Sequence, residues 1–310
     1  MARKHKKATP PKAKRSGSPT VPSRDPRQQE GARAAAAAAA QLNRRDVQAA
    51  ANIIEQGLGA APGHPDLLHL GGQVALLSGD ASRGKELIRQ AIKAAPKVAL
   101  YHYNLGNALF AENDLDGALE CFRQAVRLDL KFADAFTNLA IVFTRKNQHE
   151  EADAAFSAVA RLRPDDLQAH LNLAICNMEL RRPDQMISAI ERVESLAKQP
   201  GPELLHQIGN IYRGLGRHLI AEQYYRRALE QQPDAAQIWY ALGDVLAQAG
   251  DHGPAVESLG KALDLGFDVT AVKLRMARAL TSRGDLEEAK VLLAEAFESA
   301  GDTVGFLEDR

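Results

Sequence analysis

The stretch Tyr103-Asn104-Leu105-Gly106-Asn107 decides the fold, because its pattern returns every 34 residues along the chain. Forward steps give Thr137-Asn138-Leu139-Ala140-Ile141 and Leu171-Asn172-Leu173-Ala174-Ile175. After one inserted residue near positions 200–202, the pattern resumes as His206-Gln207-Ile208-Gly209-Asn210, Tyr240-Ala241-Leu242-Gly243-Asp244 and Leu274-Arg275-Met276-Ala277-Arg278. A backward step gives His69-Leu70-Gly71-Gly72-Gln73 and, more faintly, residues 35–39. Self-similarity at this period is typical of a solenoid of stacked repeats.

The period predicts eight repeats between a basic N-terminal tail and a short C-terminal tail. The predicted repeats are 31–64, 65–98, 99–132, 133–166, 167–201, 202–235, 236–269 and 270–303, with tails at 1–30 and 304–310.

Three positions of the repeat predict how its two halves pack together. Position 8 is always glycine or alanine: Ala38, Gly72, Gly106, Ala140, Ala174, Gly209, Gly243 and Ala277. Position 20 is small in all repeats but one: Ala50, Gly84, Ala118, Ala152, Met186, Ala221, Ala255 and Ala289. Position 24 is large: Ile54, Ile88, Phe122, Phe156, Ile190, Tyr225, Leu259 and Leu293. Small and large residues at these helical spacings predict one close helix–helix contact in each repeat.

Turn residues predict where the helices end. Position 15 is glycine or asparagine in six repeats, and both residues tolerate the left-handed conformation that ends a helix: Gly79, Asn113, Asn147, Gly216, Gly250 and Gly284. An aspartate that can cap the next helix follows at Asp46, Asp80, Asp114, Asp251 and Asp285. Prolines at position 32 should stop the second helix in four repeats: Pro62, Pro96, Pro164 and Pro233. Each repeat is therefore predicted to form a helix, a turn and a second helix.

The repeats resemble the tetratricopeptide repeat, whose signature places an aromatic residue, Leu-Gly, Tyr, Ala, Phe, Ala and Pro at fixed offsets. The best match runs from Tyr103 to Leu130, and Trp239 precedes another copy. The resemblance covers about 270 residues. It implies an all-α fold, a right-handed superhelical solenoid of eight helix-turn-helix hairpins. The departures are an alanine-rich first repeat, Asn177 and Met186 in the fifth, and Phe267 and Gly301 where a closing proline is usual.

Charge is distributed unevenly, although the 39 basic and 39 acidic residues of the chain balance. Residues 1–30 carry nine Lys and Arg against two acidic residues, with one aliphatic valine and several prolines and serines. Such a segment buries too little apolar surface to offset its ordering entropy, so we expect a disordered tail. It either contacts nucleic acid or an anionic surface weakly, or serves only solubility. Without a signal sequence or membrane span, the expected localisation is cytoplasmic.

Motifs for catalysis or metal binding are absent from the sequence. Gly57-Leu58-Gly59 lies at a predicted helix end rather than after a strand, and no second histidine follows His149 at metal-binding spacing. Cys121 and Cys176 have no CxxC partner. We therefore expect no catalytic residues, no metal and no cofactor, and the protein is not predicted to be an enzyme.

The family resemblance implies a concave groove lined by the first helices of the repeats. The candidate peptide-binding residues are Tyr103, Asn104, Asn107, Asn138, Ile141, Asn172, His206, Gln207, Asn210, Arg213, Arg275 and Arg278. Amides both donate and accept hydrogen bonds, so a row of them can bind the backbone of an extended peptide. Alternatively, these asparagines bridge neighbouring repeats. Arg275 and Arg278 make the C-terminal groove basic, which favours an acidic segment, although Tyr103 and His206 replace the lysine of a chaperone-type carboxylate clamp.

The predicted function is a protein-protein interaction scaffold that binds an extended peptide or protein segment. Repeats three to five resemble the repeat half of O-linked N-acetylglucosamine transferases, so a substrate-selecting module beside a glycosyltransferase or sulfotransferase is the alternative. The apolar C-terminal end, with Phe306 and Leu307, also predicts weak self-association.

Overall fold

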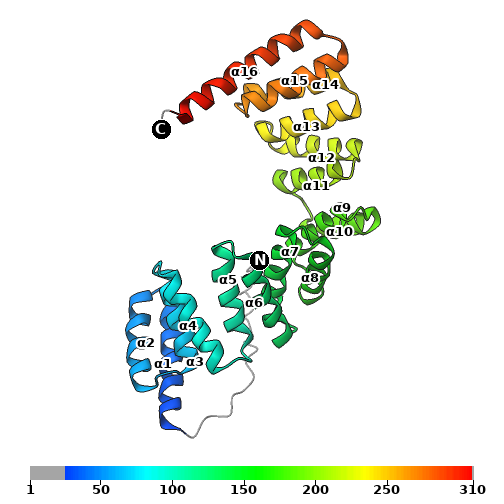
Figure 1. The fold of residues 1–310 in the computed structure, drawn as a ribbon. Coiled ribbons are helices and arrows are strands. Elements are labelled where there is room, and N and C mark those ends of the chain that lie inside the picture. The colour runs from blue at the N-terminus through cyan, green and yellow to red at the C-terminus, as the bar shows by residue number, and fades with distance from the viewer. Residues whose placement is uncertain (1–24, 309–310) are drawn as a thin grey trace, which may run out of the picture. The chain divides into compact units, whose positions relative to one another are not determined.

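The computed structural model describes the backbone of residues 25–308 and the side chains of residues 25–298. Sixteen helices and no strand make up the described backbone (Figure 1). The chain divides into two compact units, unit 1 (Met1–Glu112) and unit 2 (Asn113–Arg310).

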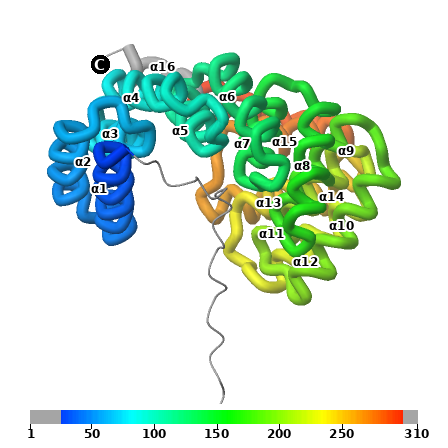
Figure 2. Tube along the Cα trace, turned by 90° about the horizontal axis from the view of Figure 1, so that it is seen from below, coloured from blue at the N-terminus to red at the C-terminus, as the bar shows by residue number. Residues whose placement is uncertain are grey.

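Unit 1 contains five helices that follow one another in chain order. They are α1 (Pro26–Asn43), α2 (Val47–Ala60), α3 (Pro65–Leu77), α4 (Ala81–Ala94) and α5 (Ala99–Ala111). In both views α1 to α4 lie side by side (Figure 1, Figure 2).

Unit 2 contains the remaining eleven helices. They are α6 (Leu115–Leu128), α7 (Ala133–Arg145), α8 (His149–Leu162), α9 (Leu167–Glu179), α10 (Pro183–Ala197), α11 (Pro202–Gly214), α12 (His218–Gln231), α13 (Ala236–Ala249), α14 (His252–Asp264), α15 (Val269–Arg283) and α16 (Leu286–Glu308). The helix bounds follow the predicted repeats, and each odd-numbered helix of this unit packs against the even-numbered helix after it. The same pairing joins α1 to α2 and α3 to α4 in unit 1. The fold is therefore an all-α array of helix-turn-helix repeats.

The predicted packing positions lie in the core of the repeats. Position 8 is buried in all eight, and position 24 is buried in seven. A Cβ atom on Gly72 would lie 2.6 Å from Cγ1 of Ile88, and one on Gly209 would lie 2.5 Å from Cε1 of Tyr225. These distances are shorter than a van der Waals contact, so the missing side chain lets the two helices approach. The steric prediction from the sequence is confirmed at these two positions.

Every turn inside a repeat has a residue with positive φ at position 15. The six predicted glycines and asparagines have φ between 56° and 100°. The other two are Arg45 (φ 63°) and Arg181 (φ 55°). Asp46, Asp80 and Asp114 cap the following helices, each accepting a backbone N–H three residues on. Asp251 makes no such bond, and Arg283 binds the carboxylate of Asp285.

The first and last helices extend a few residues past the predicted tail boundaries. Helix α1 begins at Pro26, inside the expected tail, because the Asp25 side chain accepts the N–H of Arg27 and proline fits the first helical turn. The rest of that tail, residues 1–24, lies outside the described residues. At the other end α16 continues to Glu308 instead of ending near residue 303, and no proline follows position 303 to stop it.

The last repeat also departs from the packing pattern. Leu293 at position 24 is 37% exposed, whereas its seven equivalents are buried. In the first repeat, the equivalent Ile54 packs against Leu67 and Leu70 of the helix that follows. No helix in the described residues combines the length and apolar character needed to span a membrane.

Candidate functional site

All candidate groove residues lie on first helices of the repeats. They are distributed over α5 (Tyr103, Asn104, Asn107), α7 (Asn138, Ile141), α9 (Asn172), α11 (His206, Gln207, Asn210, Arg213) and α15 (Arg275, Arg278). Those on α5 belong to unit 1 and the others to unit 2.

In unit 1, Asn104 joins two neighbouring repeats. Its Nδ2 donates to Nε2 of His69 on α3 at 2.6 Å. The His69 ring stacks on Tyr101 with centroids 4.6 Å apart, and the Tyr101 hydroxyl donates to Asp66. Burial lowers the pKa of His69 to about 4, against an opposing effect from Asp66. Asn104 therefore bridges two neighbouring repeats, which is the alternative to peptide binding that the sequence left open. Tyr103 and Asn107 are half-buried on the same helix.

In unit 2, Ile141 and Asn172 meet at an open, mainly apolar hollow of about 150 Å³. We call it the α7–α9 hollow, and it is lined by Ile141, Thr144, Arg145, Phe156, Asn172, Ile175 and Cys176. Asn172 is half-buried at this hollow, and its Oδ1 accepts from Nε2 of Gln168 at 3.1 Å. Asn138 is half-buried on α7. Burial, followed by the charge of Asp153, raises the pKa of the Cys176 thiol to about 11, which keeps the thiol protonated at neutral pH.

On α11, the predicted polar residues are largely occupied within the fold. His206 is only 5% exposed, so its side chain lies in the interior rather than on an open surface. Its Nε2 pairs with Nδ2 of Asn210 at 3.2 Å, and the Tyr225 hydroxyl donates to Oδ1 of Asn210 at 2.8 Å. Burial lowers the pKa of His206 and raises that of Tyr225 to about 12. Gln207 donates to Glu203 at 3.0 Å.

Asp244 connects three successive first helices and was missed from the sequence. Asp244 is 3% exposed. Its carboxylate accepts from Nη1 of Arg213 on α11 at 2.9 Å and forms an ion pair with Nη1 of Arg275 on α15 at 3.0 Å. Gln248, one turn further along α13, donates to it at 2.9 Å. Asp244 occupies position 9, the position of Asn107 and Asn210 in other repeats. The sequence signal for this contact is an aspartate at position 9, with Arg213 in the preceding repeat and Arg275 in the following one.

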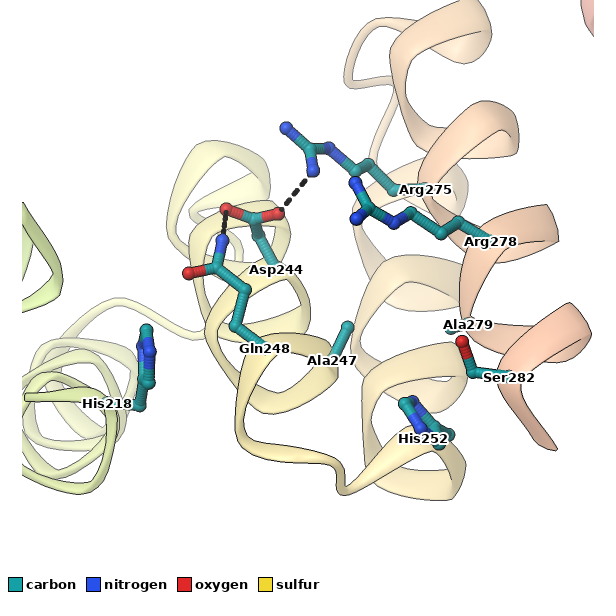
Figure 3. A pocket seen from close by; sticks show the side chains of 9 residues that line it. All are labelled: His218, Asp244, Ala247, Gln248, His252, Arg275, Arg278, Ala279 and Ser282. Atoms are coloured by element: carbon teal, nitrogen blue, oxygen red, sulfur yellow. Dashed lines mark hydrogen bonds and ion pairs between the residues drawn. The ribbon is translucent and has the colours of Figure 1, made fainter. Parts of the chain in front are cut away.

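A second and larger pocket lies beside Asp244, with a volume of about 510 Å³. We call it the basic pocket, and it is lined by His218, Asp244, Ala247, Gln248, His252, Arg275, Arg278, Ala279 and Ser282. Figure 3 shows the guanidinium groups of Arg275 and Arg278 side by side, with that of Arg275 linked to Asp244. The structure thus brings together two of the predicted basic residues, which come from one helix.

Comparisons with known proteins agree with the prediction that the chain consists of tetratricopeptide repeats. Models described as a tetratricopeptide repeat match residues 137–200 and 202–265, and one described as a TPR repeat matches residues 106–146. Together these matches span just over half of the 310 residues. Tetratricopeptide repeat protein 7A of Homo sapiens is 33% identical over 73 residues, 23% of this chain. The chain matches only 8% of the length of that relative.

Solved structures share the fold at low sequence identity. The structure of pilF from Pseudomonas aeruginosa is 16% identical with a TM-score of 0.55, covering 67% of this chain and 95% of that one. A tetratricopeptide repeat protein from Parabacteroides merdae is 13% identical with a TM-score of 0.54, covering 81% and 99%. At these identities the likeness shows the fold alone. The finer resemblance to O-linked N-acetylglucosamine transferases stays a prediction from the sequence.

Proposed function

Because the chain belongs to the tetratricopeptide-repeat family, we propose that it is a non-catalytic scaffold that binds an extended segment of a partner protein along its first helices. The observation that carries this proposal is the α7–α9 hollow, where Ile141, Asn172 and Ile175 converge from two neighbouring first helices. An apolar hollow beside a partly exposed amide suits a peptide, because a side chain can fill the hollow while the amide holds the backbone.

The amide of Asn172 has hydrogen-bonding capacity to offer a ligand. Its Oδ1 accepts from Gln168, and its Nδ2 has no hydrogen-bond partner among residues 25–298. Asn104 and Asn210 differ, since both already bind side chains within the fold. The proposed peptide contact is therefore centred on α7 and α9, with Asn138 as a further candidate, and does not use every asparagine of the predicted row.

A peptide selected on the full chain from a random display library tests the proposal. Replacing Asn172 with Ala should weaken binding of that peptide by about 0.5–1.5 kcal/mol, the net value of one hydrogen bond. Asn52→Ala is the matched control, because Asn52 accepts from Gln48 in the same i to i+4 arrangement at 3.2 Å but lies on the second helix α2. Calorimetry that gave equal losses for the two variants would contradict the proposal.

Asn104→Ala separates the two roles of the asparagines. It would leave Nε2 of the buried His69 without its partner, which costs about 1–3 kcal/mol of stability. The folded variant should keep its affinity for the selected peptide.

Four further predictions rest on the sequence alone. They are the alternative role beside a glycosyltransferase or sulfotransferase, the weak contacts of residues 1–30, self-association through the C-terminal end and the cytoplasmic localisation.

A further inference from the structure

We propose that the basic pocket of unit 2 is a recognition site for an oxyanion carried by the partner segment, namely the carboxylate of an aspartate or glutamate side chain. This inference rests on the proposed function and extends it from the α7–α9 hollow to a second site on α13 and α15. The basic pocket lies between helices that all belong to unit 2.

The balance of charge around the pocket favours an anion. Asp244 contributes one negative charge and is shared between Arg213 and Arg275. Arg278, which also lines the pocket, is exposed and forms no ion pair with any described residue. These four groups therefore leave two positive charges without a counterion in the described part of the chain. A carboxylate entering the pocket would compensate one of them.

Asp244 also holds one of the two arginines in place. The Arg275 guanidinium forms an ion pair through Nη1 with Asp244 at 3.0 Å and donates from Nε to the Tyr240 hydroxyl at 3.4 Å. Hydrogen bonding to Tyr240, assisted by the charge of Asp244, raises the pKa of Arg275. A guanidinium has five N–H donors, so Nη2 remains available to a ligand. A pre-positioned donor loses less conformational entropy when a ligand binds than a mobile side chain does.

The shape and lining of the pocket suit a side chain of a peptide. A volume of about 510 Å³ accommodates an acidic side chain together with hydrating water molecules. Figure 3 shows the two guanidinium groups on one side of the pocket and His252 and Ser282 on another, so polar groups surround an entering chain. Planar guanidinium groups match the two oxygens of a carboxylate, which makes a carboxylate the ligand that we assign.

The test uses the full chain and a fluorescently labelled, acetylated hexaglutamate peptide, with hexaglutamine as the uncharged control. Anisotropy should show tighter binding of hexaglutamate, and the affinity should fall as salt screens the charges. Arg278→Gln should weaken binding by about tenfold, the effect of losing one charge-assisted hydrogen bond. The matched control is Arg161→Gln, which removes the same charge from an exposed position on α8 outside the pocket. That variant should bind within about twofold of the wild type.

The outcomes separate this inference from the proposed function. Equal affinity for hexaglutamate and hexaglutamine, or equal losses from the two arginine variants, would overturn the pocket assignment. Tighter binding of a matched peptide with one phosphoserine would overturn the choice of carboxylate. If selected peptides depend on Asn172 while hexaglutamate fails, only the pocket inference falls. If hexaglutamate depends on Arg278 but Asn172→Ala and Asn52→Ala behave alike, the pocket stands and the proposed contact at Asn172 falls.

Discussion

The absence of a side chain at Gly209 is what lets the Tyr225 ring reach the backbone of α11. Tyr225 is fully buried, and its hydroxyl is committed to Asn210 at 2.8 Å, so the ring has little freedom to move away. Gly243 is in the same situation, because a Cβ atom there would lie 2.6 Å from Cγ of Leu259. At these positions the small residue is a steric requirement of the contact between the two helices.

Gly209→Ala should therefore destabilise the protein by about 1–3 kcal/mol, as overpacking of a filled core does. Gly260→Ala is the opposite case, since the space around Gly260 on α14 is open and alanine favours a helix by about 0.8–1 kcal/mol. Thermal unfolding of the two variants should shift in opposite directions. A higher melting temperature for both variants would show that the Tyr225 ring can shift to accommodate the added methyl group.

At the scale of the helix and turn, the sequence predicted the turns inside the repeats but not the start of the first helix or the end of the last one. The six glycines and asparagines at position 15 were recognised because such residues favour positive φ. Arg45 and Arg181 adopt the same conformation without that preference, since the packing of the flanking helices imposes the turn. The start of α1 was missed for another reason: the Lys, Pro and Ser content of residues 1–30 outweighed the local capping signal of Asp25 and Pro26.

Asp25→Ala should loosen the first turn of α1, because it removes the side chain that accepts the Arg27 N–H at 3.0 Å. Loss of an N-terminal cap typically costs about 1 kcal/mol. Hydrogen exchange should accelerate at the first amides of α1 and stay unchanged in α3. Asp25→Asn is the control, since asparagine caps about as well as aspartate. Identical exchange in the alanine variant and the wild type would show that Pro26 alone fixes the start.

At the scale of the whole chain, the site was harder to predict than the fold. The fold follows from a 34-residue period that is visible along the sequence. The carboxylate of Asp244 acquires its role from arginines 31 residues before and after it, and no local pattern reports such a contact. His206 likewise carries no sign in the sequence that its ring is buried. Arg275 and Arg278 were predicted because the family resemblance places first-helix residues on the groove, and their spacing of three residues puts them on one face of α15.

Acid should destabilise the repeats around His69 without a direct effect on distant ones, because the stability of a repeat array is approximately a sum of repeat and nearest-neighbour terms. The folded pKa of about 4 lies below the ordinary 6.5, so only the unfolded chain gains a proton between these values. Stability contributed by the neutral ring is complete above pH 6.5 and falls by about 1.4 kcal/mol per pH unit down to about pH 4.

Hydrogen exchange of α3 to α5, corrected for intrinsic rates and compared at pH 7 and pH 5, measures this loss. His69→Phe keeps an aromatic ring against Tyr101 and removes the titrating group, so its protection in these helices should depend less on pH. Because burial also lowers the pKa of His206 in unit 2, a global melting temperature would mix the two histidines. Equal pH dependence of protection in α3 for the variant and the wild type would contradict the assignment.

Because the turns inside the repeats share one backbone conformation, genetic recombination can remove or duplicate a whole repeat without changing the turn. Gly216 and Gly250 occupy the same left-handed position of successive repeats, with φ of 75° and 94°. Excision of residues 217–250 would join Gly216 to Asp251, which recreates the Gly-Asp dipeptide found at Gly79 and Gly284. The new hairpin would set Gly209 against Leu259, a glycine–leucine contact that Gly243 already makes in α13 and α14. A gene encoding such turns can lose or duplicate one period and still encode hairpins whose helices fit together.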